Sequence, residues 1–233
     1  MQIKRIFLGL VVAFTLNSCI NTIDGNGNVQ VEQRDVSSFN KIDISGNFDI
    51  LINQGKKEQL ELEVDENLLE FIETEVKNNT LHISSKKQLG NAESLQLYIT
   101  VIDIDDIEAS GAIQLKNKGT LETENLEIEI SGAADIKLNL NVVNLTMDMS
   151  GASETRLSGS ADNFEIEISG AGELLAKKLK TKNTTIDISG AGSAVVFVKK
   201  TLKVEVSGAG SVEYKGDPKI EKDISGAGSV TRL

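Results

Sequence analysis

The sequence predicts an all-β fold, a right-handed parallel β-solenoid whose coils each take about 18–21 residues. A short motif recurs at a nearly constant interval, and apolar residues alternate with polar ones before each copy. The 233-residue chain also contains 20 Gly but only one Pro. Right-handed winding is expected because connections between parallel strands almost always take that hand.

The recurring motif is Ser-Gly-Ala, which occurs seven times between residues 110 and 225, and a related Ser-Gly-Asn stands at 45–47. A unit of this length with one apolar face cannot fold alone, so the units must stack. Equivalent residues of stacked coils lie about 4.8 Å apart. A bend at such a position requires a small residue, and Gly also reaches positive φ. The predicted structural corners are Ser110 and Gly111, Ser131 and Gly132, Ser150 and Gly151, Ser169 and Gly170, Ser189 and Gly190, Ser207 and Gly208, and Ser225 and Gly226.

The residues before each corner have the period of a strand with one buried face. Residues 126–130, for example, read Leu-Glu-Ile-Glu-Ile, an alternation typical of such strands. After the corner, a second apolar set is expected at alternate positions of residues 136–140 and, in a later coil, at Val195 and Phe197.

An Asn recurs six residues before the corner Ser and predicts a ladder of stacked amides. Side-chain amides in adjacent coils can pass hydrogen bonds from one coil to the next. An antiparallel sandwich would also space short strands closely, but it gives no reason for Ser, Gly and Asn to recur in phase. The ladder residues are Asn125, Asn144, Asn163 and Asn183.

The regular coils are expected over residues 104–233, and residues 29–103 are expected to form less regular opening coils of the same solenoid. Strand-like alternation continues in that segment, with a single helical turn predicted after Asp65. In the last coil Lys222 occupies a slot that is apolar elsewhere. A polar terminal coil is typical of an uncovered solenoid end.

Residues 1–18 read as a lipoprotein signal peptide. Lys4 and Arg5 precede an apolar run over 6–14, which is too short to span a membrane. Residues 16–19, Leu-Asn-Ser-Cys, resemble a bacterial lipobox, so Cys19 is the predicted lipidation site. The protein would then be exported and held at the outer membrane by its N-terminal lipid, facing the periplasm or the cell surface. Residues 19–28 would form a polar tether. The alternative is an ordinary cleaved signal that leaves a free thiol.

Acidic composition and scarce Cys and His exclude several classes of function. The formal charge of −11 argues against nucleic acid as a partner, because phosphate binding needs clustered Lys and Arg. One Cys and one His leave neither a disulfide framework nor a His-based ligand pair. The Ser of the repeat is no candidate nucleophile, since an active-site nucleophile does not occur seven times. We therefore expect no catalytic activity and no required cofactor.

An acidic residue stands two positions before each corner Ser, and stacking would align these acids along one outer face. The plain interpretation is a solvated face that maintains solubility and discourages edge-to-edge association. The functional interpretation is a strip that collects a basic partner or weakly bound Ca²⁺, which accepts irregular carboxylate geometry. The calcium candidates are Glu129, Asp148, Glu167, Asp187 and Glu205.

A family resemblance rests on several motifs at once. Residues 39–50, Phe-Asn-Lys-Ile-Asp-Ile-Ser-Gly-Asn-Phe-Asp-Ile, are followed by Gln54-Gly55, an acidic Glu-Asn-Leu-Leu at 66–69 and Leu-His-Ile at 81–83. With the repeated Ser-Gly-Ala-Gly, this pattern resembles the GIN-domain family, named for autotransporter-adhesin head domains. The resemblance covers residues 29–233. It implies a β-helical domain on surface or periplasmic lipoproteins of diderm bacteria, with no catalytic or binding residues to carry over.

Together these features predict a lipid-anchored, non-catalytic, adhesin-like binding module whose ligand is an extracellular protein or a glycan. A structural envelope scaffold is the first alternative. A β-helical polysaccharide-active enzyme is another, and it would require a cleft near Arg156 that pairs this residue with Lys and Asp. Fold alone does not license such an activity. The oligomeric state is left open.

Overall fold

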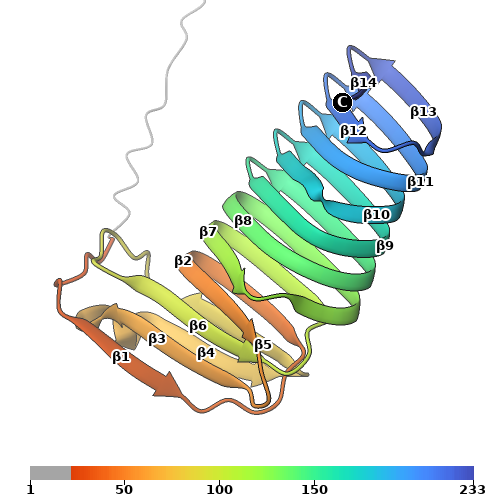
Figure 1. Cartoon of the computed structure of the whole chain (residues 1–233). Helices are drawn as coiled ribbons and strands as arrows, with labels where there is room; N and C mark the ends of the chain where they lie inside the picture. The colour runs from red at the N-terminus through yellow and green to blue at the C-terminus, as the bar shows by residue number, and fades with distance from the viewer. Residues whose placement is uncertain (1–21) are drawn as a thin grey trace, which may run out of the picture.

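The computed structural model describes residues 22–233 and consists almost entirely of strands (Figure 1). About 75% of it is strand and 3% helix. The elements are β1 (Val29–Arg34), β2 (Lys41–Gln54), β3 (Gln59–Asp65), the 3-10 helix η1 (Glu66–Phe71), β4 (Ile72–Lys77), β5 (Thr80–Ser85), β6 (Leu95–Val101), β7 (Asp106–Lys118), β8 (Leu121–Gly151), β9 (Glu154–Gly170), β10 (Glu173–Gly190), β11 (Ser193–Gly208), β12 (Ser211–Lys215), β13 (Lys219–Gly226) and β14 (Ser229–Arg232). Within these residues no helix has the length and hydropathy needed to cross a membrane.

The predicted solenoid is confirmed, with about six turns that stack from β2 to β14. All neighbouring strands from β7 onward pair in parallel, as the coils in Figure 1 show. The register aligns corner with corner: Ser45 pairs with Ser110, and Ser110 pairs with Ser131. Strand β8 is 31 residues long and passes through a corner without interruption. A corner is therefore a bend within continuous pairing, not a loop between strands.

The core is a single cluster that begins among β2 to β6 and continues along the solenoid as far as β12. Alternate positions before every corner except the last are almost completely buried, for example Ile128 at 0% and Ile166 at 1% exposure. The predicted inward positions Val195 and Phe197 are wrong, because Ala194, Val196 and Val198 are buried instead. Residues 194–198 are apolar at every position, so the sequence pattern does not show which side chains point into the core. The pairing of β11 with β10 decides this.

The prediction of opening coils over residues 29–103 holds only for β2 and for the parallel partners of β2, namely β5 and β6. Strand β3 pairs antiparallel with both β1 and β6, and β4 pairs antiparallel with β5. The β4–β5 hairpin is closed by a turn at Asn78 and Asn79, which have φ of 50° and 64°. Two consecutive residues with positive φ make the tight turn of an antiparallel hairpin. We call β1, β3, β4, β5, β6 and η1 the N-terminal cap.

The predicted polar tether is wrong for residues 23–28, which belong to the folded unit. The Ile23 amide donates to the Gln88 carbonyl at 2.9 Å, and the Gly25 amide donates to the Asn91 carbonyl at 2.7 Å. The physical reason is Asp65, which is fully buried and accepts a bond from the Gly27 amide at 2.8 Å. A buried carboxylate requires such donors. The predicted signal peptide over 1–18 and Cys19 lie outside the described residues.

The far end of the solenoid is open. Lys222 pairs with Val204, which is fully buried, so Lys222 stands in an inward phase on the last coil. All but one residue of β13 are exposed, and Ile220 is 37% exposed. A charged residue at an inward position discourages another strand from adding to this edge.

Candidate binding surfaces of the solenoid

The corner glycines form a continuous ladder along one edge of the solenoid. The eight glycines of this column, Gly46 and the seven predicted ones, have φ between 98° and 138°. A Cβ on Gly170 would lie 2.7 Å from the carbonyl oxygen of Gly151, and the Ala171 amide donates to that oxygen at 3.0 Å. Close backbone stacking of this kind leaves no room for a side chain. The edge is therefore straight and rigid, and it fixes the columns beside it.

The Asn residues before the corners are hydrogen-bonded from coil to coil. The Nδ2 of Asn144 donates to Oδ1 of Asn125, and Nδ2 of Asn163 donates to Oδ1 of Asn144, both at 2.8 Å. The Nδ2 of Asn183 donates to Oδ1 of Asn163 at 2.9 Å. The two inner amides, Asn144 and Asn163, thus use both a donor and an acceptor along the ladder, which holds the coils in register.

A second Asn pair, at another turn of the coils, was not predicted from the sequence. The Asn139 amide donates to Oδ1 of Asn117 at 2.8 Å, and Nδ2 of Asn117 donates to the Asn139 carbonyl at 3.1 Å. The Ser158 hydroxyl continues the contact by donating to Oδ1 of Asn139 at 3.2 Å. The sequence signal for this contact is a second polar column, Asn117, Asn139 and Ser158, spaced by about one coil. The repeat is hard to recognise because the third residue is Ser instead of Asn.

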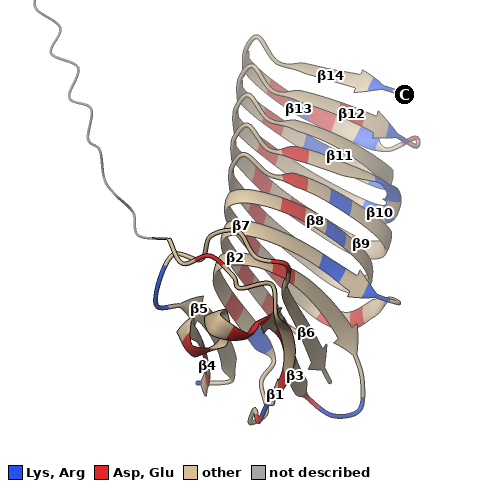
Figure 2. Ribbon diagram, turned by 90° about the vertical axis from the view of Figure 1, so that its left-hand side faces the viewer, with Lys and Arg blue, Asp and Glu red and all other residues tan. Residues whose placement is uncertain are grey.

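The acids two positions before the corners lie in register, on an outward face (Figure 2). Asp148 pairs with Glu167, and Glu167 pairs with Asp187. The pKa of Glu108 is raised, first by desolvation, then by repulsion from Asp106 on the same strand, and then by repulsion from the stacked Asp43 and Glu129. Repulsion between stacked carboxylates is therefore already felt at the first coils.

No three His, Cys, Asp or Glu side chains within residues 22–233 converge on a point that could hold a metal ion. The acidic column instead presents single carboxylates at coil spacing, beside a small hollow of about 140 Å³ lined by Glu108, Glu129 and corner serines. The Lys203 ammonium balances one of these charges at 2.7 Å from Glu205, and Nδ1 of His82 lies at hydrogen-bond distance, 2.9 Å, from the Asp43 carboxylate. Weak calcium association along the column stays a prediction.

A shallow open groove of about 670 Å³ runs beside the corners on the opposite side from the acidic column. Small residues such as Ala133 and Ala152 line it, together with Asp135 and Glu154. Arg156 lies next to it, with Nη1 at 3.1 Å from the Asp135 carboxylate and a second ion pair to Glu154. The Arg156 charge is thus matched by two carboxylates, and the groove has the open form that suits an extended ligand rather than a small molecule.

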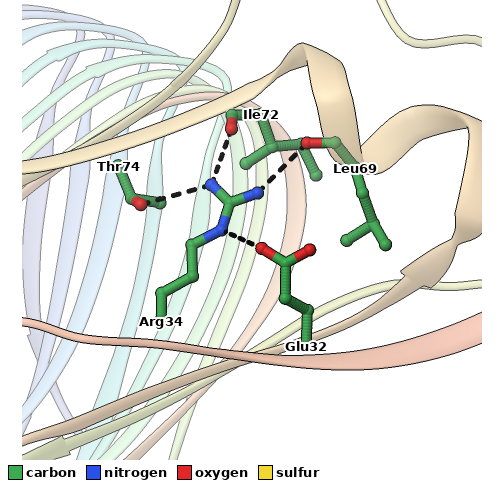
Figure 3. Close-up of polar contacts among 5 residues, drawn as sticks. All are labelled: Glu32, Arg34, Leu69, Ile72 and Thr74. Carbon is green, nitrogen blue, oxygen red and sulfur yellow. Dashed lines mark hydrogen bonds and ion pairs between the residues drawn. The ribbon is translucent and has the colours of Figure 1, made fainter.

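Arg34 is the central polar residue of the N-terminal cap (Figure 3). Its Nη1 donates to the Ile72 carbonyl at 2.6 Å and to the Thr74 hydroxyl at 3.2 Å, and its Nη2 donates to the Leu69 carbonyl at 3.1 Å. Its Nε donates to Glu32 at 2.6 Å. One guanidinium therefore joins β1 to η1 and β4. Its partners on η1 and β4 lie 35–40 residues away, so no local signal could reveal this role.

The family model described as "Putative auto-transporter adhesin, head GIN domain" matches residues 38–218. The chain belongs to this family. The resemblance seen in the sequence is thereby confirmed, and the matched residues run from β2 through the cap elements β3 to β6 and along the solenoid as far as β12.

Solved structures share the whole described fold. A "putative adhesin" from Bacteroides fragilis is 26% identical, with a TM-score of 0.84, over 91% of this chain and 100% of that chain. A "putative lipid binding protein" from Parabacteroides distasonis is 23% identical, with a TM-score of 0.76, over 91% of this chain and 99% of that one. A "putative adhesin" from the same species is 22% identical, with a TM-score of 0.75, over 91% and 100%. The last two likenesses show the fold alone. Curated proteins yield no match.

Proposed function

We propose that this GIN-domain protein is exported, held at the outer membrane by lipid on Cys19, and acts as a non-catalytic adhesin-like binding module. Family membership and the similar fold of the B. fragilis "putative adhesin" support a role at the cell surface or envelope. The lipid anchor rests on the Leu-Asn-Ser-Cys sequence at residues 16–19.

The observation that carries the binding role is the register of the coils. Ser pairs with Ser and Gly with Gly from β2 to β13, so outward side chains form straight columns on a rigid body. A rigid surface loses little conformational entropy when it binds, which favours affinity for extended ligands. The open groove beside the corners is one such surface.

Anchoring is tested with the full chain carrying Cys19→Ser. The variant should move from the detergent phase to the aqueous phase in detergent partitioning and should not undergo lipoprotein processing. If the variant partitions like the wild type, the lipobox interpretation is wrong.

Surface display and binding are tested separately. Protease applied to intact cells should remove the protein, and the purified mature chain should retain a specific ligand from an array of matrix proteins and glycans. Complete protection from protease would place the domain in the periplasm and contradict adhesion. Surface exposure without any retained ligand would instead favour a structural scaffold.

A further inference from the structure

Charge is distributed unevenly along this acidic chain. Residues 171–233 contain 11 Lys and Arg against seven Asp and Glu, whereas residues 1–170 contain 13 against 28. Figure 2 shows blue segments on the coils of β10, β11 and β13. The terminal coils are thus locally basic within a protein of formal charge −11.

An aromatic ring lies on the outer face of these basic coils. Lys180 pairs in register with Phe197, and Phe197 pairs with Lys215 on the following coil. The Lys215 ammonium lies 5.1 Å from the centre of the Phe197 ring, which is the geometry of a cation–π contact. The side chain of Phe197 is half-buried. The other residues of its column are polar, because Ser160 occupies the equivalent position one coil before Lys180. A ring at an otherwise polar outward position has no role in the core.

More lysines lie within two or three residues of Lys180 and Phe197 along the same strands. Lys178 on β10 and Lys199 and Lys200 on β11 are exposed. Within the described part of the chain, these three ammonium groups take part in no ion pair, whereas Lys182 pairs with Asp162 at 2.6 Å. Uncompensated charges near a half-buried ring create a local positive potential that attracts anions. We call Lys178, Lys180, Phe197, Lys199, Lys200 and Lys215 the lysine–phenylalanine patch.

We propose that the lysine–phenylalanine patch binds an acidic polysaccharide chain. This inference rests on the proposed function and names the ligand class for it. The lysines would pair with carboxylate or sulfate groups repeated along the polymer, and the face of Phe197 would stack on the apolar face of a sugar ring. The patch spans the coils of β10 to β12, about 10 Å along the solenoid at about 4.8 Å per coil, so it suits a chain with regularly spaced charges.

The position of the patch favours a polysaccharide over a lipid surface. The first described residues are hydrogen-bonded to the segment between β5 and β6 of the cap, through Ile23 and Gly25, and the coils of β10 to β12 lie toward the opposite end of the molecule (Figure 1). A lipid on Cys19 would therefore hold the cap near the membrane and direct the patch away from it. The strongly acidic residues 1–170 also repel anionic bilayers and nucleic acids, whose charges extend over a wide surface.

The test measures binding of the purified mature chain to immobilised polygalacturonate and chondroitin sulfate, with dextran as the neutral control. The patch variant carries Lys178→Gln, Lys180→Gln, Lys199→Gln and Lys200→Gln. Its affinity should fall by about tenfold or more, because charged contacts to polyanions dominate such binding. Wild-type affinity should also fall steeply between about 50 mM and about 300 mM NaCl as screening increases.

A matched control changes the net charge equally at another place. Lys56, Lys57, Lys86 and Lys87 are exposed on loops of the cap, and their replacement by Gln should alter affinity by less than about twofold if the contact is local. Phe197→Ser keeps every charge and should weaken binding by about threefold to tenfold through lost stacking. Unchanged thermal melting of each variant verifies that the fold is intact.

Three outcomes would overturn the inference. Equal losses from the two lysine quadruplets would show diffuse attraction, and preferential binding to vesicles of phosphatidylglycerol would identify a membrane surface instead. Failure of both polysaccharides to bind, with a protein ligand still retained on the array, would reject the patch while the adhesin-like function stands. The proposed function fails separately, through periplasmic location.

Discussion

Replacement of Gly170 by Val tests whether the corners are stacked as the structure shows. Gly170 has φ of +127°, and a Cβ there would lie 2.7 Å from the Gly151 carbonyl oxygen. A side chain forced into that backbone region costs about 1–3 kcal/mol. Overpacking against a backbone atom that cannot move freely adds about 1–3 kcal/mol. The free energy of unfolding should therefore fall by about 2–6 kcal/mol.

Thermal unfolding followed by circular dichroism measures this loss. In a protein of this size, each kcal/mol lowers the melting temperature by about 2–4 °C, so Gly170→Val should lower it by about 4–24 °C. Repeat proteins can lose cooperativity when one unit is weakened. Limited proteolysis should therefore report cleavage near the altered corner before the whole chain melts.

Two control variants separate the causes. Gly119 also has positive φ, +76°, but a Cβ there meets nothing within 4 Å, so Gly119→Val retains the backbone strain without the clash. The exposed Glu165→Gln should change stability by less than about 0.5 kcal/mol. If Gly170→Val costs no more than Gly119→Val, the close approach of successive corners is refuted. If it costs no more than Glu165→Gln, the stacked arrangement itself is refuted.

Three further predictions concern polar groups. Burial alone would raise the pKa of Asp65, but three backbone donors outweigh it and hold the pKa below the usual value of 3.8. Asp65→Asn should therefore lower the free energy of unfolding at pH 7, as measured by urea unfolding. The lowered pKa means that the ionised carboxylate stabilises the folded state above about pH 4 and that this stabilisation is lost as the pH falls through the folded-state pKa. The difference in unfolding free energy between the variant and the wild type should therefore shrink below about pH 4. Replacing Asp148, Glu167 and Asp187 by Asn, Gln and Asn should raise the melting temperature at low ionic strength, since carboxylates about 4.8 Å apart repel by about 0.9 kcal/mol even in water. The triple variant should also lose any stabilisation by millimolar Ca²⁺. If calcium stabilises the wild type no more than a salt of matched ionic strength does, the calcium prediction is wrong. Asn163→Ala removes two ladder bonds and should lower the melting temperature by about 2–4 °C, corresponding to about 1 kcal/mol, and an unchanged value would show that the ladder is incidental.

The parts of the fold that were predictable repeat along the chain. Strict alternation before each corner identifies the buried side of a strand such as residues 126–130, because a side chain on a strand has only two directions. The Ser-Gly-Ala spacing likewise determines the coil length, since a bend column tolerates only small residues at a separation of about 4.8 Å. The positions of the ladder Asn residues could also be predicted, because they recur at the same coil spacing.

The parts that needed the tertiary structure depend on contacts between distant residues. Residues 194–198 are apolar in both phases, and only their pairing with β10 decides that Val196 is inward and Phe197 outward. The antiparallel pairing of β3 with β1 and β6 also follows from partners rather than from period. The lysine–phenylalanine patch depends on register in the same way, because it unites side chains from three coils.

For this protein the sequence by itself determined the class of fold, the length of the coil and the family. Each of these follows from a short sequence pattern that recurs in every regular coil, so the same local preference can be recognised several times along the chain. The tertiary structure alone decided the architecture of the cap, the docking of residues 23–28 on Asp65 and the role of Arg34. Those features occur once and join residues about 40 positions apart, so their energy lies in long-range hydrogen bonds that no local pattern encodes.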